Sequence, residues 1–562
     1  MRHQLPHLTV FTLALLTAQA HAQSVPPPRD PFEQLQRERL ERERERALER
    51  SPGGIDAPQP SAGDDGALPE QLPETGPTFI IDRITWQGEA LLRAAEFDRL
   101  RAPFLGKPLG VRRINLLLDR INRALLNAGY ITSRAYVARQ QLKEGELVVT
   151  VVPGRIEDIR YNGVSVETGR PGQTGVRMAL PMAAGDLLQL RDIEQAVDQF
   201  NRLRRNQAQV RIRPGEQAGG SIVEIANRQG KAAQTTLTAD NLGAADTGKL
   251  RLQLGIETGD VLGLMESFAF GLNSSMENNA VYASLALPFG YGTASCMASW
   301  SEYQNLIGDT ALVYGVSESV SVTYNHLLQR DRHSKIMADI GLTRRRAERS
   351  VNNARLTPQV HSALRLGVNR LTRFDNAHGA GQWSLDLGWV RGLDWLNADR
   401  DAAALPAEAA QAQFDKLEFT ANLHLPLGSG QAWRSRLSGQ WSATPLFSSE
   451  QLFAGGINSV RGFAESAQGG DRGVSLRNEW VKQNLPPLFG LPLRAEPYLF
   501  LDGARLQTLA DRRWHSLLGA GAGVRLGFAG GQMELIAGWP LIKPHAEFDS
   551  GPRFNLSLAY TF

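Results

Sequence analysis

The chain has 562 residues, enough for several domains, and its 61 Lys and Arg residues nearly balance its 58 Asp and Glu residues. This balance gives no sign of a nucleic-acid-binding surface, and the single cysteine, Cys296, excludes an intrachain disulfide and a cysteine zinc cluster. Beyond the N-terminus no window holds the ~18 consecutive apolar residues that a membrane-spanning helix needs, and a mean hydropathy of −0.27 argues against a helical membrane protein.

Residues 1–22 have the pattern of a secretory signal peptide. Arg2 gives a positive start, residues 8–18 form a short apolar stretch, and Ala20-His21-Ala22 fits a small-x-small cleavage site. We therefore predict that the mature chain starts near Gln23 and that residues 1–22 take no part in the fold.

Residues 30–50 predict a polar helix. Asp30 suits the N-cap and Pro31 the first helical position, and Glu and Arg then recur at i,i+3 and i,i+4 spacings that stabilise a helix. Such a helix is about 30 Å long, close to the thickness of the bilayer hydrocarbon. Two interpretations stay open: a solvated helix, or a plug inside a water-filled lumen. For the plug, the candidate residues are Phe32, Arg37, Arg42 and Arg46.

Residues 51–77 and 78–228 predict a linker followed by two α+β modules. The linker is dense in Pro, Gly, Ala and Asp and should be disordered, with a coil span of about 30 Å. Residues 78–154 predict strand, helix, helix, strand, strand, and residues 155–228 repeat the plan. The expected core face of the main helix in each module is Val111, Ile114, Leu118, Ile121 and Leu125, then Ile193, Ala196, Val197, Phe200 and Leu203. Two modules of unrelated role are the alternative.

In residues 229–562 the hydrophobic period changes to two. Alternation means one wet and one apolar face, and a sheet whose apolar face meets lipid must close on itself. We count about sixteen segments of ~10 residues or more, a usual number for an outer-membrane barrel. Their centres lie near residues 236, 253, 268, 284, 297, 321, 340, 364, 387, 419, 436, 478, 500, 521, 536 and 558. The predicted fold is a membrane β-barrel of about 16 antiparallel strands with two N-terminal α+β domains and a plug helix.

A long Gly- and Ser-rich loop at residues 446–473 interrupts this pattern. It carries Val460-Arg461-Gly462-Phe463 after a Gly-Gly pair and before Leu-Arg-Asn-Glu. This context resembles the sixth extracellular loop of the two-partner secretion transporters, the haemolysin-activator and haemagglutinin-secretion pores. The family carries an N-terminal plug helix and periplasmic POTRA domains. Within residues 78–154, the sequence from Gly129 to Ser133 is similar to the first POTRA domain, and residues 155–228 resemble the second. The aromatic end, Phe562 after Tyr560, is typical of barrels delivered to the assembly machinery.

Arg461 is the candidate functional residue of the loop, and Val460, Gly462 and Phe463 complete the predicted loop lock. A tip folded into the lumen would bury the guanidinium, which then requires an anionic partner. Phe500 and Asp502 share one face of a strand that should point into the lumen, and Glu479 is a second candidate acid.

The resemblance implies a Phe-x-Asp-x-Gly motif around Asp502. This sequence departs from it, because Gly503 follows Asp502 directly and Ala504 occupies the usual glycine position. The assignments of Phe500 and Asp502 are unaffected by this departure, whereas the role of the glycine is left open.

The resemblance implies a monomeric outer-membrane pore, set in lipid, that secretes a large partner exoprotein of adhesin or haemolysin type. The POTRA domains would capture the unfolded partner in the periplasm. No enzyme, cofactor or metal site is expected. Residues 243–249 imitate a P-loop, but Leu250 stands where Ser or Thr would bind magnesium, so nucleotide hydrolysis is unsupported. The alternatives are a barrel-assembly insertase and a passive porin.

Overall fold

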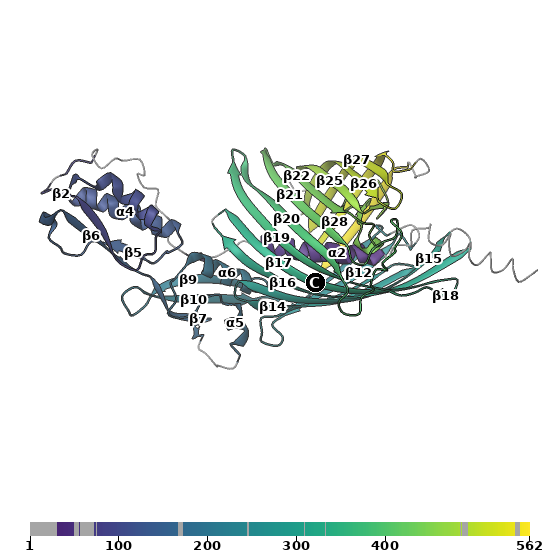
Figure 1. Cartoon of the computed structure of the whole chain (residues 1–562), viewed down its shortest axis with the longest axis horizontal. Coiled ribbons are helices and arrows are strands. Elements are labelled where there is room, and N and C mark those ends of the chain that lie inside the picture. Colours follow the sequence, from purple (N-terminus) through teal and green to yellow (C-terminus); the bar gives the residue numbers. More distant parts are fainter. Residues whose placement is uncertain are drawn as a thin grey trace, which may run out of the picture.

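The computed structural model describes residues 31–49, 55–56, 72–74, 76–166, 172–243, 247–307, 310–331, 333–483, 485, 493–545 and 551–562. Two small α+β units lie beside a closed β-barrel, and helix α2 (Pro31–Glu49) lies within the outline of the barrel (Figure 1). The predicted signal peptide, residues 1–22, lies outside the described residues. Among the described residues, no helix combines the length and hydrophobicity that crossing a bilayer requires.

The first α+β unit has a three-stranded sheet of order β3–β6–β5 and a separate β2–β4 pair. Its elements are β2 (Phe79–Ile81), β3 (Arg83–Gly88), α3 (Ala94–Arg101), η2 (Ala102–Phe104), β4 (Lys107–Leu109), α4 (Val111–Asn127), β5 (Arg134–Tyr136), η3 (Leu142–Glu144) and β6 (Glu146–Val152). The face predicted for α4 is partly wrong. Val111 is 71% exposed, because it starts the helix at the edge of the unit, and Leu117 and Ala124 are buried beside Ile121 and Leu125.

The second α+β unit has a five-stranded sheet of order β1–β9–β10–β7–β8. Its elements are β1 (Ile55–Asp56), β7 (Arg155–Tyr161), β8 (Val164–Ser165), α5 (Thr174–Ala179), α6 (Leu190–Phe200), β9 (Asn206–Pro214) and β10 (Gly220–Gln229). The predicted core face of α6 is buried, Ile193, Ala196, Val197 and Phe200 all being inaccessible to solvent.

Strand β1 comes from the predicted linker. Ile55 and Asp56 pair in parallel with Val210 and Arg211 of β9, so the expectation of disorder is wrong at these two positions. The physical reason is that β9 would otherwise present unpaired N–H and C=O groups at the sheet edge.

The barrel consists of sixteen long strands among the described residues, and β18 (Ala354–Arg355) extends it at one end of β17. They are β11 (Ala233–Asp240), β12 (Arg251–Gly259), β13 (Ser267–Ser274), β14 (Asn278–Phe289), β15 (Gly292–Ile307), β16 (Ala311–Arg330), β17 (Ser334–Val351), β19 (Gln359–Asn376), β20 (Gly379–Leu393), β21 (Asp415–Gly428), β22 (Gln431–Ser442), β25 (Arg472–Lys482), β26 (Arg494–Thr508), β27 (Arg513–Phe528), β28 (Gly531–Ile542) and β29 (Arg553–Thr561). Each predicted centre falls in one of these strands, and the fold prediction is confirmed.

The barrel closes where β11 pairs antiparallel with β29, from Thr236 opposite Thr561 to Asp240 opposite Ser557. Asn241 extends the closure, because its side chain donates to the Phe554 carbonyl and accepts from the Leu556 N–H. The seam is therefore paired over five register positions, and the hydrogen bonds of the Asn241 side chain hold it beyond them.

Helix α6 marks the mouth of the barrel that faces the α+β units. Gln199 donates to the Gly290 carbonyl in the short turn between β14 and β15 at 2.8 Å, and Arg202 donates to the carbonyl of Met265, between β12 and β13. The long loop 446–473 starts from the opposite ends of the strands. The α+β units and the long loop thus belong to opposite mouths.

The alternation on β29 can be tested by placing a charge on either face. Leu558 is 42% exposed toward lipid, whereas Ser557 lies opposite Asp240 and Glu534 on the lumen face. We expect Leu558→Arg to lower the free energy of unfolding from bilayers by about 2–4 kcal/mol if the site is near the midplane. The matched variant Ser557→Arg should cost clearly less, because acidic groups face it. Equal losses, measured by urea titration, would contradict the assignment of the faces.

Candidate functional site

The long loop, residues 446–473, is folded and anchored at its base. It contains η4 (Ser448–Glu450) and a hairpin of β23 (Leu452–Ala454) with β24 (Gln468–Gly470). Asp471 is inaccessible to solvent. Its carboxylate accepts from the backbone N–H of Leu446 at 2.8 Å and of Leu509 at 2.6 Å. This carboxylate, at one end of the loop, binds the other end at Leu446 and the end of β26 at Leu509.

The loop tip, Val460 to Phe463, is buried against the barrel wall. Val460 and Phe463 pack in an apolar cluster with Ala454, Ala504, Leu506 and Leu517. Gly462 has a φ of +94°, and a Cβ on it would lie 2.9 Å from the Trp539 carbonyl carbon. Only glycine combines this backbone conformation with so close an approach. The glycine is therefore what allows the tip to lie flat on β28.

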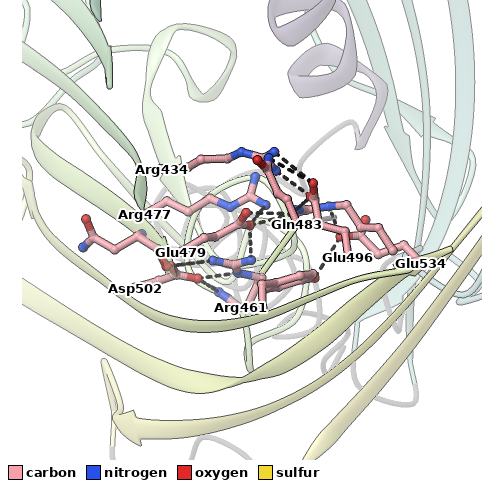
Figure 2. Close-up of polar contacts among 11 residues, drawn as sticks. Arg434, Arg461, Arg477, Glu479, Gln483, Glu496, Asp502 and Glu534 are labelled. Atoms are coloured by element: carbon pink, nitrogen blue, oxygen red, sulfur yellow. Dashed lines mark hydrogen bonds and ion pairs between the residues drawn. The ribbon is translucent and has the colours of Figure 1, made fainter. Parts of the chain in front are cut away.

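Arg461 is the largest fully buried side chain of the tip, at 2% exposure. Its Nε lies 2.7 Å and its Nη2 2.8 Å from the two carboxylate oxygens of Asp502, and Nη1 lies 2.5 Å from Glu479. The guanidinium also lies 4.0 Å from the centre of the Phe500 ring. Figure 2 shows the guanidinium between the two acids. The bidentate pair with Asp502, the second acid Glu479 and the face of the Phe500 ring together compensate the guanidinium for its loss of water.

The two acids belong to a larger network on β22, β25, β26, β27 and β28 (Figure 2). Glu479 also accepts from Arg477 at 2.6 Å and from Arg525 at 2.8 Å. Arg525 reaches Glu534 and Glu496, and Glu496 holds Arg434 through both carboxylate oxygens. The network has four basic members and four acidic ones, Arg434, Arg461, Arg477, Arg525, Glu479, Glu496, Asp502 and Glu534. Its charges balance, as they should around the buried side chains of Arg461, Asp502 and Glu479.

The structure explains the departure from the family motif at Gly503 and Ala504. A Cβ on Gly503 would meet nothing closer than 3.4 Å, so no close approach requires a glycine there. Ala504 is 8% exposed and packs on the loop tip beside Val460. The position next to the tip therefore accepts a methyl group.

A second anchor of the loop, which the sequence analysis missed, involves Glu450. Lys416 of β21 is 2% exposed and lies 2.8 Å from the Glu450 carboxylate. His361 of β19 stacks on Phe447 at 5.7 Å and lies 3.1 Å from the Ser449 hydroxyl. Burial opposes ionisation of Glu450, but Lys416 and His361 hold the pKa of its carboxyl well below the usual value. The only sequence signal was an isolated acid early in the loop, which does not identify its partner.

Helix α2 is held inside the barrel by ion pairs to several strands. Arg436 of β22 lies 3.0 Å from Glu41 and 2.5 Å from Glu45, and Arg44 lies 3.1 Å from Asp386 of β20. On the opposite side Arg39 stacks on the Tyr282 ring of β14 at 3.3 Å. Contacts to β14, β20 and β22 surround the helix, so it crosses the lumen.

The residues predicted for the plug differ from those with the shortest contacts. The side chain of Phe32 lies outside the described residues. Arg37 lies 5.9 Å from the Phe453 ring in the long loop, Arg42 is exposed, and Arg46 lies 3.9 Å from Glu257. Because Glu and Arg alternate all along the helix, the sequence does not reveal which of them face an oppositely charged strand.

The arrangement holds charges in fixed places along the inner wall of the barrel. The described residues include no group of three or more His, Cys, Asp or Glu side chains placed to bind a metal ion. What the geometry can do is attach a loop and a helix to the inner wall, the loop through buried ion pairs and the helix partly through ion pairs that water reaches.

Comparison with known proteins gives consistent matches along the chain. Residues 219–526 match the family described as haemolysin secretion/activation protein ShlB/FhaC/HecB. Residues 79–154 match the ShlB-type POTRA domain, and residues 155–214 match a POTRA domain.

Individual relatives cover most of the chain. The outer membrane transporter CdiB of Escherichia coli O6:K15:H31 is 31% identical over 92% of this chain and 87% of its own. The hemolysin transporter protein ShlB of Serratia marcescens is 29% identical over 87% of each chain. The solved structure of CdiB from Escherichia coli superposes with a TM-score of 0.82 at 28% identity, covering 94% of this chain and 98% of that one.

The ion pairs at the loop tip can be tested by removing the guanidinium. Arg461→Ala leaves Asp502 buried without its ion-pair partner, and we expect the free energy that holds the tip to fall by about 3–5 kcal/mol. Hydrogen exchange of residues 446–473 should accelerate accordingly. Arg461→Lys should be intermediate, because lysine keeps the charge but not the two-pronged geometry.

Two further variants make this measurement specific. Arg461→Ala with Asp502→Asn should exchange more slowly than Arg461→Ala alone, since no unpaired charge is then buried. Arg400→Ala breaks an exposed pair with Asp394 and should have no effect on the tip. Unchanged exchange in Arg461→Ala would show that the pair does not hold the loop.

Proposed function

Because this chain belongs to the haemolysin secretion/activation family ShlB/FhaC/HecB and is an outer-membrane transporter of two-partner secretion, we propose that it exports its exoprotein through a lumen held at rest by loop 446–473 and helix α2. The observation that carries the proposal is Arg461, buried at 2% exposure between Asp502 and Glu479. The POTRA domains lie in the periplasm.

The loop tip is proposed to hold the conducting architecture of the barrel. Arg461 joins β25 and β26 through Glu479 and Asp502, and Gly462 approaches β28. Leu517 of β27 packs on the tip as well, so four consecutive strands, β25 to β28, have fixed positions relative to the loop. A wall with a fixed shape gives a passing chain a lumen of constant width.

Helix α2 is proposed to be the plug of the resting pore. It is a polar rod of 19 residues, about 28 Å long, and it crosses a lumen of similar depth. Its ion pair to β22 is partly exposed, so water can replace that pair at small cost when the helix leaves. The contrast with the buried Arg461 supports a mobile plug and a fixed loop.

Capture of the unfolded exoprotein is proposed to occur at a sheet edge of a POTRA domain. An extended segment that adds a strand gains backbone hydrogen bonds with little demand on its sequence. Strand β9 of the second POTRA domain, which would be an edge strand without β1, accepts the two residues of β1 in this way, which supports the capacity of this sheet to take an extended segment. Folding of the exoprotein outside the cell would then drive transport without nucleotide hydrolysis or catalysis by this chain.

The proposal predicts the secretion phenotype of Arg461→Ala. The variant barrel should insert into the outer membrane in normal amounts, but secretion of the exoprotein should fall at least tenfold, because loss of the buried pair shifts the loop equilibrium by more than about 1.4 kcal/mol. The measurement is the amount of exoprotein in the medium relative to barrel in the membrane. Normal secretion would contradict a role for the loop tip in transport.

Exchanging the charges with Arg461→Asp and Asp502→Arg should restore only a small part of secretion. Glu479 would then face a second carboxylate at position 461. Deleting the gene separates the competing functions: a transporter deletion removes one large extracellular protein, an insertase deletion depletes barrels in general, and a porin deletion reduces uptake of small solutes.

The plug can be tested by deleting residues 31–49. Conductance in planar bilayers should rise, because the deletion leaves the space that α2 occupies to water and ions. A matched control is Glu41→Gln with Glu45→Gln, which removes both acids that contact Arg436 and should give an intermediate rise. Unchanged conductance of the deletion would count against the plug.

A further inference from the structure

The C-terminal end of α2, the mouth of the barrel and the second POTRA domain meet at one buried lysine. Lys335 is the second residue of β17 and is 4% exposed. Its Nζ lies 2.8 Å from the Ala47 carbonyl oxygen in the last turn of α2. The same Nζ lies 3.0 Å from the carboxylate of Asp198 in α6. One ammonium group of the barrel therefore contacts two other parts of the molecule, α2 and the second POTRA domain.

The contact to Ala47 follows the physics of helix ends. The last four carbonyl groups of a helix lack intrahelical partners and carry a partial negative charge. The barrel supplies cations to two of them, since Arg373 of β19 donates to the Glu49 carbonyl at 2.9 Å. Leu48, between these two residues, is 3% exposed. The end of α2 is thus capped by side chains of the barrel.

Asp198 supplies the charge that makes the buried lysine tolerable. A buried ammonium with only neutral acceptors is strongly disfavoured, and the Asp198 carboxylate neutralises it. Arg330, 4% exposed in its side chain, lies 2.8 Å from the same carboxylate and 2.9 Å from Glu194. The acids of α6 therefore hold both Lys335 and the adjoining end of β16.

We infer that Lys335 and Asp198 are positioning residues that couple the docking of the second POTRA domain to the retention of helix α2. Asp198 fixes the Lys335 ammonium on the Ala47 carbonyl. When an exoprotein segment shifts α6, the Asp198 carboxylate moves away from Lys335. The ammonium group then loses the charge that neutralises it and is no longer held against the Ala47 carbonyl. The cap on α2 then weakens at the moment of capture. This inference rests on the proposal that α2 obstructs the lumen.

The coupling is tested with full-length variants in planar bilayers. Lys335→Met removes the cap, and Asp198→Asn leaves Lys335 in place but removes its counter-ion. We expect both to raise the open fraction about tenfold or more, the range for loss of a buried charged hydrogen bond. The double variant should not exceed the larger single effect, because both act through one contact. Lys335→Arg keeps the positive charge at this position and should keep the conductance as low as in the native chain.

A matched control is Asp192→Asn. Asp192 lies on the same helix and accepts a hydrogen bond from Tyr291 of the barrel. It should leave the open fraction unchanged, although it removes one docking contact of α6. Equal rises in Asp192→Asn and Asp198→Asn would indicate general undocking and overturn the coupling.

Two outcomes separate this inference from the plug proposal. If deletion of residues 31–49 raises conductance but Asp198→Asn does not, the plug stands and the coupling is wrong. If the deletion leaves conductance unchanged, the plug proposal itself fails. Heat-dependent gel mobility of each variant verifies that the barrel is folded.

Discussion

The need to neutralise every charge inside the barrel governs the arrangement of its contents. A guanidinium or carboxylate away from water is strongly disfavoured unless an opposite charge and the remaining hydrogen bonds are present. Arg461 meets this condition by two acids and an aromatic ring. Lys416 meets it through Glu450, and Lys335 through Asp198. Loop, helix and POTRA domain are each attached to the wall by this one rule.

The degree of burial separates fixed parts from movable ones. The side chains of Arg461 and Asp502 are 1% and 0% exposed, whereas those of Arg436 and Glu41 are 26% and 37% exposed. Breaking the Arg461–Asp502 pair leaves both charges in surroundings that stabilise them poorly. Breaking the Arg436–Glu41 pair exposes both charges to water. The loop tip is therefore attached more firmly than α2, although both use arginine and carboxylate. Charge count alone would not distinguish them.

The sequence predicted what depends on local periodicity and missed what depends on contacts between distant segments. The sixteen strands follow from alternation, so all predicted centres are correct. Asp502 and Glu479 could be proposed as partners of Arg461 because each is an acid on the lumen face of a neighbouring strand. Lys416 with Glu450, and Lys335 with Asp198, could not, because no pattern in the sequence shows which strand of the wall faces Glu450 or Asp198. The pairing of β1 with β9 escaped for the same reason: two residues carry no period.

The pairing of Ile55 with β9 limits the travel of α2 by covalent geometry. Five residues, 50–54, connect Glu49 to Ile55, so the end of the helix stays within about 20 Å of that strand, even with the connection fully extended. Passage of α2 through the extracellular mouth would raise this end by at least the helix's own length, about 28 Å. While β1 stays paired, this short connection would let an α2 that leaves the lumen withdraw only toward the periplasm.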